Sequence, residues 1–549
     1  MKFTRLTALA AAAVIPMTLF SCNYGYQSDR DKKKSESEVS LRDELRKGDH
    51  PELIDRYEPV SVEQLNAMIE QFLDDCHSSG NDVQGDIDAL LEALAKCFDA
   101  KSYSEIAYYM DFDNDALEAE ADGCTEEASV AYEAVSYAFH TAYATAYPEY
   151  VDLLKPYIDD EWLDYYTSPG VTLERIEKYA KQSFADSDSN LDSYYDMAYG
   201  DEDDEDKLDL EAAELYLDIL EDYTTEDFYT GFNRDYTPDE IMPVCEMVNS
   251  ELVPVYQKFY DSIMDHEELE ALSTADFPEE KLLPTLTSFA GQLSPEIGDA
   301  AKKLVDKNLC FFAEGDKSYN GSFTTTLPLD KDSLIYIYRY GSPDDMVGLI
   351  HEFGHFYSSY FDDTNIYFQV NNLDVAEIQS QGMELLFLKY YDQIFGDQSG
   401  IMRLYKLSDI MDYAISGCLI GEFEYKVLQN RDSLTPAEVV ECYHEIMDDY
   451  YPDSHFYDIS HIFEQPGYYI SYGVSALAAL DIINECYEDP QKALEQYNKI
   501  AHVKAFSPDT SFKAALSECG FSDVLSEGYI KELASTMDRI LERETQVLE

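Results

Sequence analysis

The chain has 549 residues, of which 45% are hydrophobic and 13% aromatic, so it is long enough for a large core and too apolar for a disordered protein. Its 112 Asp and Glu residues outnumber 38 Lys and Arg, which gives a formal charge of −74. A surface this negative repels phosphate backbones and anionic lipid headgroups, which excludes nucleic acid as a partner. We interpret the charge as a solvated surface; a field that favours cationic peptides is the alternative.

The start of the chain predicts export and a lipid anchor. A basic start, Met1–Arg5, precedes an apolar run, Leu6–Phe20, that is too short to span a bilayer comfortably. The run ends in Ser21-Cys22, which resembles a bacterial lipobox, although an ordinary signal peptide with a chance cysteine would look similar. Residues 1–21 are therefore predicted to be a signal peptide, and residues 22–45 a lipid-anchored linker. We expect an extracytoplasmic protein attached to the bacterial cell membrane through lipidated Cys22.

Residues 46–305 are predicted to form an N-terminal helical lobe. Apolar residues recur there at the spacing of a helix face, in the sets Leu65, Met68, Ile69, Phe72 and Leu90, Leu91, Leu94, Phe98. Nine cysteines follow Cys22 without any Cys-x-x-Cys pair, which excludes a cysteine-based zinc site. Most of them are predicted to be buried, small apolar side chains.

Two strands are predicted where the helical pattern stops, near residue 319. Residues 320–327 and 333–340 are rich in β-branched and aromatic residues, and the turn at 330–332 would pair them. After residue 343 the pattern is helical almost to the end. The sequence therefore predicts a second lobe, 306–549, that is mainly helical with a small β-sheet.

A helix that begins near Ser342 and Pro343 carries the motif His351-Glu352-Phe353-Gly354-His355. Two histidines four residues apart lie on one helix face, so both imidazoles can reach a single zinc ion. Glu352 follows the first histidine and is placed to act as general base toward a zinc-bound water. A chance alignment of two structural histidines is the alternative, and the capped helix directly after strands argues against it.

A catalytic zinc ion needs a third protein ligand, which we expect from the next predicted helix, residues 372–386. Glu377 lies 22 residues beyond His355 (377 − 355), far enough for the chain to turn back. Glu384, two turns further on, is the competing candidate. Spacing alone leaves the choice between the two glutamates open.

These segments together resemble the thimet oligopeptidase and oligoendopeptidase F family of zinc peptidases. The resemblance covers roughly residues 315–485 and rests on the His351–His355 motif and on Val375-Ala376-Glu377, followed by Ser380, Gln381 and Glu384. It implies that Glu377, with His351 and His355, holds one Zn²⁺ per chain. It also implies a zincin-like, two-lobed helical fold.

A later segment resembles the part of the family that faces the metal. His461 is followed by Tyr468 and Tyr472, and the resemblance implies that these three side chains stabilise the tetrahedral intermediate. Their hydroxyl and imidazole groups can donate to a developing oxyanion. With 46 tyrosines in the chain a Tyr cluster can arise without function, and His455 is a nearby alternative to His461.

The expected function is zinc-dependent hydrolysis of oligopeptides outside the cytoplasm, with Glu352 as the base. The predicted strand from Leu334 to Tyr340 is an edge on which an extended peptide could add as a further strand. The alternative is a catalytically inactive surface lipoprotein that binds peptides on the same fold. The retained Glu352 argues against that alternative, because a binding protein has no need of a base.

Overall fold

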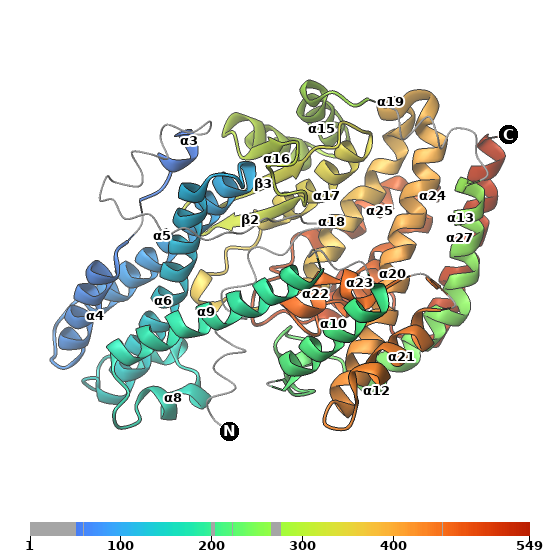
Figure 1. Ribbon diagram of the computed structural model, residues 1–549. Coiled ribbons are helices and arrows are strands. Elements are labelled where there is room, and N and C mark those ends of the chain that lie inside the picture. The colour runs from blue at the N-terminus through green and yellow to red at the C-terminus, as the bar shows by residue number, and fades with distance from the viewer. Residues whose placement is uncertain are drawn as a thin grey trace.

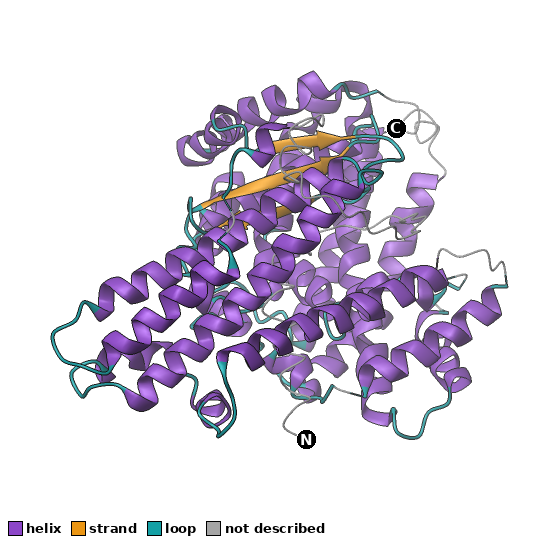
Figure 2. Cartoon of the chain, turned by 60° about the vertical axis from the view of Figure 1, so that its left-hand side comes forward, coloured by secondary structure: helices purple, strands orange, loops and turns teal. Residues whose placement is uncertain are grey.

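The computed structural model describes residues 51–548 except 59, 199–203, 222, 265–275, 449 and 453. The predicted signal peptide, Cys22 and the linker lie outside these residues. The described chain is mainly helical with one small sheet, which confirms the predicted fold class (Figures 1 and 2). None of the described helices is long and apolar enough to cross a membrane.

The first long helices form a core of their own, at the left of Figure 1. The predicted apolar stripes are its centre: Leu65, Ile69 and Phe72 are buried on one helix, and Leu90, Leu94 and Phe98 on the next. Ile366 and Tyr367, from much later in the chain, join this core. The helices of this region are α4 (Val62–Cys76), α5 (Val83–Met110), α6 (Asp115–Thr145), α7 (Val151–Leu154), α8 (Asp160–Tyr166) and α9 (Leu173–Ala198).

A second, larger core extends over the rest of the molecule and takes side chains from Leu53 to Leu541. It therefore draws on both sides of residue 305, and the domain boundaries stay a prediction. Its helices before the sheet are α10 (Glu205–Leu220), α11 (Asp227–Thr230), α12 (Pro238–Met247), α13 (Val253–Met264), α15 (Glu279–Leu293) and α16 (Pro295–Asp306). Those after it are α17 (Asp344–Ser359), α18 (Leu373–Phe387), α19 (Tyr391–Phe395), α20 (Ser399–Asn430), α21 (Pro436–Met447), α22 (Ser460–Glu464), α23 (Ile470–Leu480), α24 (Ile483–Glu488), α25 (Pro490–Ala501), α26 (Phe512–Cys519) and α27 (Glu527–Leu548).

The sheet is drawn in orange in Figure 2. It has three strands in the order β1-β3-β2. β2 (Phe323–Leu327) pairs antiparallel with β3 (Asp332–Tyr338), as the sequence predicts. β1 (Cys310–Ala313) was not predicted, because four residues are too short for a pattern, and it pairs parallel with the other side of β3. The prediction that the strand from Leu334 is an edge is therefore wrong: β3 is the central strand, and β1 and β2 are the edges.

The cysteines are free thiols wherever the structure describes them. Seven of the nine are buried, and Cys442 and Cys486 are half-buried. Burial raises the pKa of the Cys97 thiol to about 12, so this group stays protonated at neutral pH. The prediction that most cysteines are small apolar core residues is confirmed.

Helices α17 and α18 approach each other closely because one residue at their contact has no side chain. A Cβ atom on Gly354 would lie 2.6 Å from the Cα of Ser380 and 2.8 Å from the carbonyl oxygen of Gln379. Every residue of α18 is buried, so this helix cannot move outward to make room. The contact therefore sets the distance between the two helices that carry the predicted ligands.

We expect Gly354→Ala to lower the free energy of unfolding by roughly 1–3 kcal/mol, because a methyl group forced into a packed backbone contact strains both helices. Gly348→Ala, on the same helix, is the matched control, since a Cβ there would have no atom within 4 Å. It should instead stabilise α17 by about 0.5–1 kcal/mol through helix propensity. Thermal unfolding of the metal-free variants checks the difference, and equal shifts in the two proteins would contradict it.

Candidate metal centre

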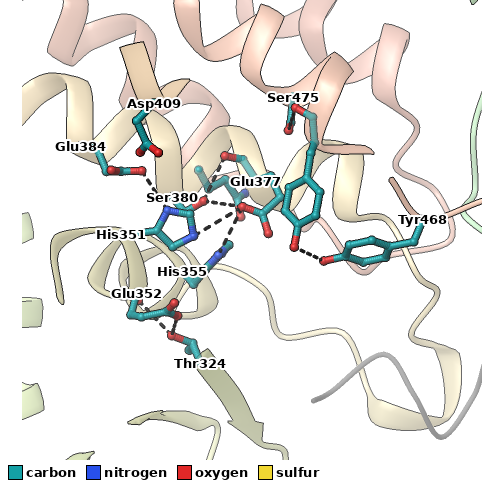
Figure 3. A network of polar contacts seen from close by, with 12 residues as sticks. Thr324, His351, Glu352, His355, Glu377, Ser380, Glu384, Asp409, Tyr468 and Ser475 are labelled. Carbon is teal, nitrogen blue, oxygen red and sulfur yellow. Dashed lines mark hydrogen bonds and ion pairs between the residues drawn. The ribbon is translucent and has the colours of Figure 1, made fainter. Parts of the chain in front are cut away.

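The structure brings His351, His355 and Glu377 together. Their ligand atoms lie within 4.8 Å of one another, and all three side chains are buried. Glu377 Oε2 is 3.5 Å from Nε2 of His351 and 3.7 Å from Nε2 of His355 (Figure 3). The two histidines come from adjacent turns of α17, and the carboxylate comes from the first half of α18.

The two distances from the carboxylate to the imidazoles fit a tetrahedral metal ion. Ligand atoms about 2.1 Å from a zinc ion lie about 3.4 Å from one another, because a tetrahedron's edge is about 1.63 times its centre-to-corner length. The observed distances are longer than an ordinary hydrogen bond, about 2.7–3.2 Å. Two imidazole nitrogens and one carboxylate oxygen are also a ligand set that catalytic zinc uses.

Glu384 lies behind His351, on the side away from the other two ligands (Figure 3). His351 donates from Nδ1 to Glu384 Oε1 at 2.8 Å, which leaves Nε2 for a metal ion. Lys406 forms a buried ion pair with the same carboxylate. Burial raises the pKa of Glu384, but Lys406 and His351 lower it more, so the net shift is downward. Glu384, the competing ligand candidate, therefore orients the ring of His351 instead of joining the three candidate ligands.

We expect Glu384→Gln to weaken zinc affinity by about 10–100-fold, because a neutral amide holds the ring in place but no longer raises its basicity. Lys406 keeps a partner in this variant, since it also pairs with Asp409 at 2.5 Å. Competition with a chromophoric chelator measures the affinity, and circular dichroism of the metal-free protein controls for folding. An unchanged zinc affinity would show that the contact does not tune the site.

Glu352 is buried beside the ligands and is held by the sheet. The hydroxyl of Thr324, on β2, donates to Glu352 Oε2 at 2.8 Å and also lies 3.0 Å from the Glu352 carbonyl oxygen (Figure 3). Burial raises the pKa of Glu352 to about 8, although His351 and Thr324 lower it. Thr324 was inside a predicted strand, but nothing in the sequence distinguishes it from its neighbours Thr325 and Thr326.

The buried groups of the centre oppose one another in charge. Burial lowers the pKa of His351, but its hydrogen bond to Glu384 and the nearby carboxylates raise it to a net value of about 9. Burial and the neighbouring His351 hold the pKa of His355 well below its usual range. Burial also raises the pKa of Glu377. A bound cation would favour the ionised form of these carboxyl groups and the neutral form of the imidazoles, which are the forms that bind a metal ion.

His461, Tyr468 and Tyr472 form a second cluster next to α18. The Tyr468 hydroxyl donates to the Tyr472 hydroxyl at 3.0 Å, and the ring of His461 stacks on Tyr468 with centroids 5.2 Å apart. Tyr468 points toward the ligands from the Glu377 side in Figure 3. His455 lies elsewhere, because its Nδ1 contacts Asp209 of α10 at 2.7 Å. Of the two histidines considered, the structure groups His461 with the tyrosines.

A buried ion pair joins this cluster to the ligand helix, and the sequence analysis missed it. Arg234 donates to both oxygens of Asp374 at 3.3 Å and to Ser471 Oγ at 2.7 Å. Tyr236 donates to the same carboxylate at 2.8 Å. Asp374 lies one turn before Glu377, and Ser471 directly precedes Tyr472, so the pair fixes α18 against α23. No local pattern marks Arg234, whose partners lie 140 and 237 residues away.

We expect Arg234→Met to destabilise the protein by about 3–5 kcal/mol, because it leaves the Asp374 carboxylate buried without a cation. Lys181→Met is the control: its pair with Glu126 is exposed, and its loss should cost less than about 1 kcal/mol. Thermal and urea unfolding compare the two. A loss for Arg234→Met as small as for the control would show that the buried pair is not needed for stability.

The sequence of the chain is similar to that of a known peptidase homologue. No protein-family model matches the chain. A curated protein of Borreliella burgdorferi named oligoendopeptidase F homolog is 25% identical over 237 residues, which are 40% of this chain. The match spans 39% of that relative, so the chain covers about two fifths of the relative's length.

The solved structures agree over nearly the whole chain. An oligoendopeptidase F structure from Bacillus anthracis has a TM-score of 0.64 at 16% identity and covers 89% of this chain and 97% of its own. The structure of Pz peptidase A with an inhibitor has a TM-score of 0.62 at 17% identity, with coverages of 89% and 98%. The chain thus has the mainly helical fold of these solved peptidase structures. Within that class it is the oligoendopeptidase F fold, and the resemblance to that family is confirmed.

Proposed function

We propose that the chain is a zinc-dependent endopeptidase that hydrolyses oligopeptides outside the cytoplasm. The observation that supports this most directly is the convergence of His351, His355 and Glu377 within 4.8 Å, with the carboxylate of Glu352 beside them. When bound, a zinc ion would polarise the peptide carbonyl and lower the pKa of a water molecule. The oligoendopeptidase F fold, and the name of the relative from Borreliella burgdorferi, support a peptidase.

The chain's own residues supply the proton transfers and the orientation. Glu352 accepts a proton at the oxygen that Thr324 leaves free and passes it to the leaving amine. Tyr472 and His461 donate to the oxyanion, and Tyr468 orients the Tyr472 hydroxyl.

The attachment to the membrane belongs to the same proposal. Lipidation of Cys22 would hold the protein at the outer side of the bacterial cell membrane, with residues 22–45 as a tether. A Cys22→Ala variant should then move from the membrane to the soluble fraction after cell fractionation. A variant that stays with the membrane would rule out lipidation at this residue.

We expect Glu352→Gln to lower kcat for peptide cleavage by about 10²–10⁴-fold, because the base is lost while the three ligands remain. Bound zinc, measured by elemental analysis, should be the same in the variant and the wild type. A quenched-fluorescence peptide library gives the rates, with intact folded proteins as the comparison for substrate length. Zinc binding without cleavage of any peptide by the wild type would favour the alternative, an inactive peptide-binding lipoprotein.

A further inference from the structure

A cavity whose lining shares no residue with the candidate metal centre contains several aromatic side chains. It has a volume of about 530 Å³ and lies where α6, α8 and the turn Lys155–Tyr157 meet the short helix Ile366–Phe368. Cavities that hold small ligands usually measure about 300–1,000 Å³. Six rings line it: Tyr132, Tyr157, Trp162, Tyr166, Tyr367 and Phe368. The cavity is therefore large enough for a small organic group.

The aromatic wall is held in place by its own contacts. Tyr132 stacks on Tyr367 with ring centroids 5.6 Å apart, and Tyr157 stacks on Phe368 at 5.3 Å. The Tyr367 hydroxyl donates to the carbonyl oxygen of Tyr157 at 3.0 Å. The rings are thus fixed relative to one another before any ligand enters, which reduces the entropic cost of binding.

His140 anchors the backbone at Asp159, and both residues line the cavity. Its Nδ1 lies 2.7 Å from the carbonyl oxygen of Ser136 and donates to it, and its Nε2 accepts the backbone N–H of Asp159 at 3.1 Å. Both ring nitrogens are therefore engaged, with the proton on Nδ1, and burial lowers the pKa of this imidazole. The histidine has a structural role and leaves recognition to the other residues.

Glu133 is the buried acid of the cavity. It is 6% exposed and accepts one hydrogen bond, from the Tyr166 hydroxyl at 2.7 Å. Within the described part of the chain no lysine or arginine forms an ion pair with it, and none lines the cavity. Burial raises the pKa of Glu133, as expected for a carboxylate that lacks a counter-ion. A cation in the cavity would gain this carboxylate together with the faces of several rings.

We propose that this cavity binds the guanidinium or alkylammonium group of an organic cation, with Glu133 as its counter-ion and the aromatic rings as its walls. A planar guanidinium group can stack on tyrosine and tryptophan faces, and an alkyl stem suits the apolar lining. The chain's charge of −74 raises the local concentration of such cations. The cation could be a free small molecule or a basic side chain of a peptide; the second source rests on the proposed function.

Trp162 reports on the cavity without any need for catalysis. It is the single tryptophan of the chain and lines the cavity, so its fluorescence should change when the site fills. The probe is N-acetyl-arginine amide, and N-acetyl-citrulline amide is its uncharged counterpart of nearly the same shape. In 150 mM NaCl we expect saturable binding of the arginine compound and at least about tenfold weaker binding of the citrulline compound. Equal affinities, or no binding of either compound, would overturn the proposal.

Glu133→Gln should weaken binding of the arginine compound by about tenfold or more, because it removes the counter-ion and keeps the shape. Asp164→Asn is the matched control, since it removes one charge from the exposed side of α8 and should leave the affinity unchanged. If Glu133→Gln fails to fold, Trp162→Leu takes its place, with binding followed by calorimetry. A variant that folds and binds as tightly as the wild type would contradict the assignment.

Peptides separate the two sources of the cation. In a quenched peptide series, one arginine is moved along the chain and compared with citrulline at each position. If the occupant is the substrate's own side chain, arginine at one position lowers KM in the wild type but not in Glu133→Gln, with kcat unchanged. If the occupant is a free molecule, the arginine and citrulline peptides have equal KM at every position. The fluorescence titration with the arginine compound still shows binding. If the wild type cleaves none of the peptides, the proposed function is wrong. The fluorescence titration still tests binding in the cavity in that case.

Discussion

The close contact of α17 with α18 at Gly354 is the constraint on which the geometry of the candidate metal centre depends. The backbones of the two helices touch at this residue, which fixes the distance between the helices. At that distance Glu377 lies within 3.7 Å of both imidazoles. A wider spacing would turn the three ligands into unrelated buried polar groups, each with a desolvation cost and no shared cation. The small residue inside the histidine motif thus determines both the packing of the two helices and the spacing of the three candidate ligands.

Around this contact, buried charges are arranged in pairs that orient the ligands. Lys406 and Glu384 hold His351 from behind, and Arg234 and Asp374 hold the start of α18 against α23. Such pairs rarely add stability compared with apolar packing, but removing one partner is costly. We therefore interpret these pairs as fixing the positions of the candidate ligands rather than as adding to the free energy of unfolding.

The parts of this structure that sequence could predict are those with a local signal. His351 and His355 are recognisable because i, i+4 spacing on a helix places both rings on one side. Glu377 and Glu384 are seven residues apart on the same helix face, so spacing could not separate them, and the choice required the family resemblance. The structure shows the difference between them: Glu377 lies near both Nε2 atoms, and Glu384 contacts the Nδ1 atom of His351.

The roles of Arg234 and Thr324 depend on long-range contacts and could not be predicted. The same is true of the central position of β3, whose second neighbour is a four-residue strand.

The Arg234–Asp374 pair makes the folding of the candidate site depend on segments that are far apart in the sequence. Its two members come from segments on either side of residue 305, and the pair also reaches Ser471, so it closes loops of 140 and 237 residues. A fragment that starts after residue 305 would retain the ligands but bury Asp374 without Arg234 or Tyr236. The histidine motif and its glutamate would then be present in the polypeptide without the ion pair that fixes α18 against α23. The C-terminal half alone therefore lacks a contact that positions α18. The segment before residue 305 has to fold against it before the site is complete.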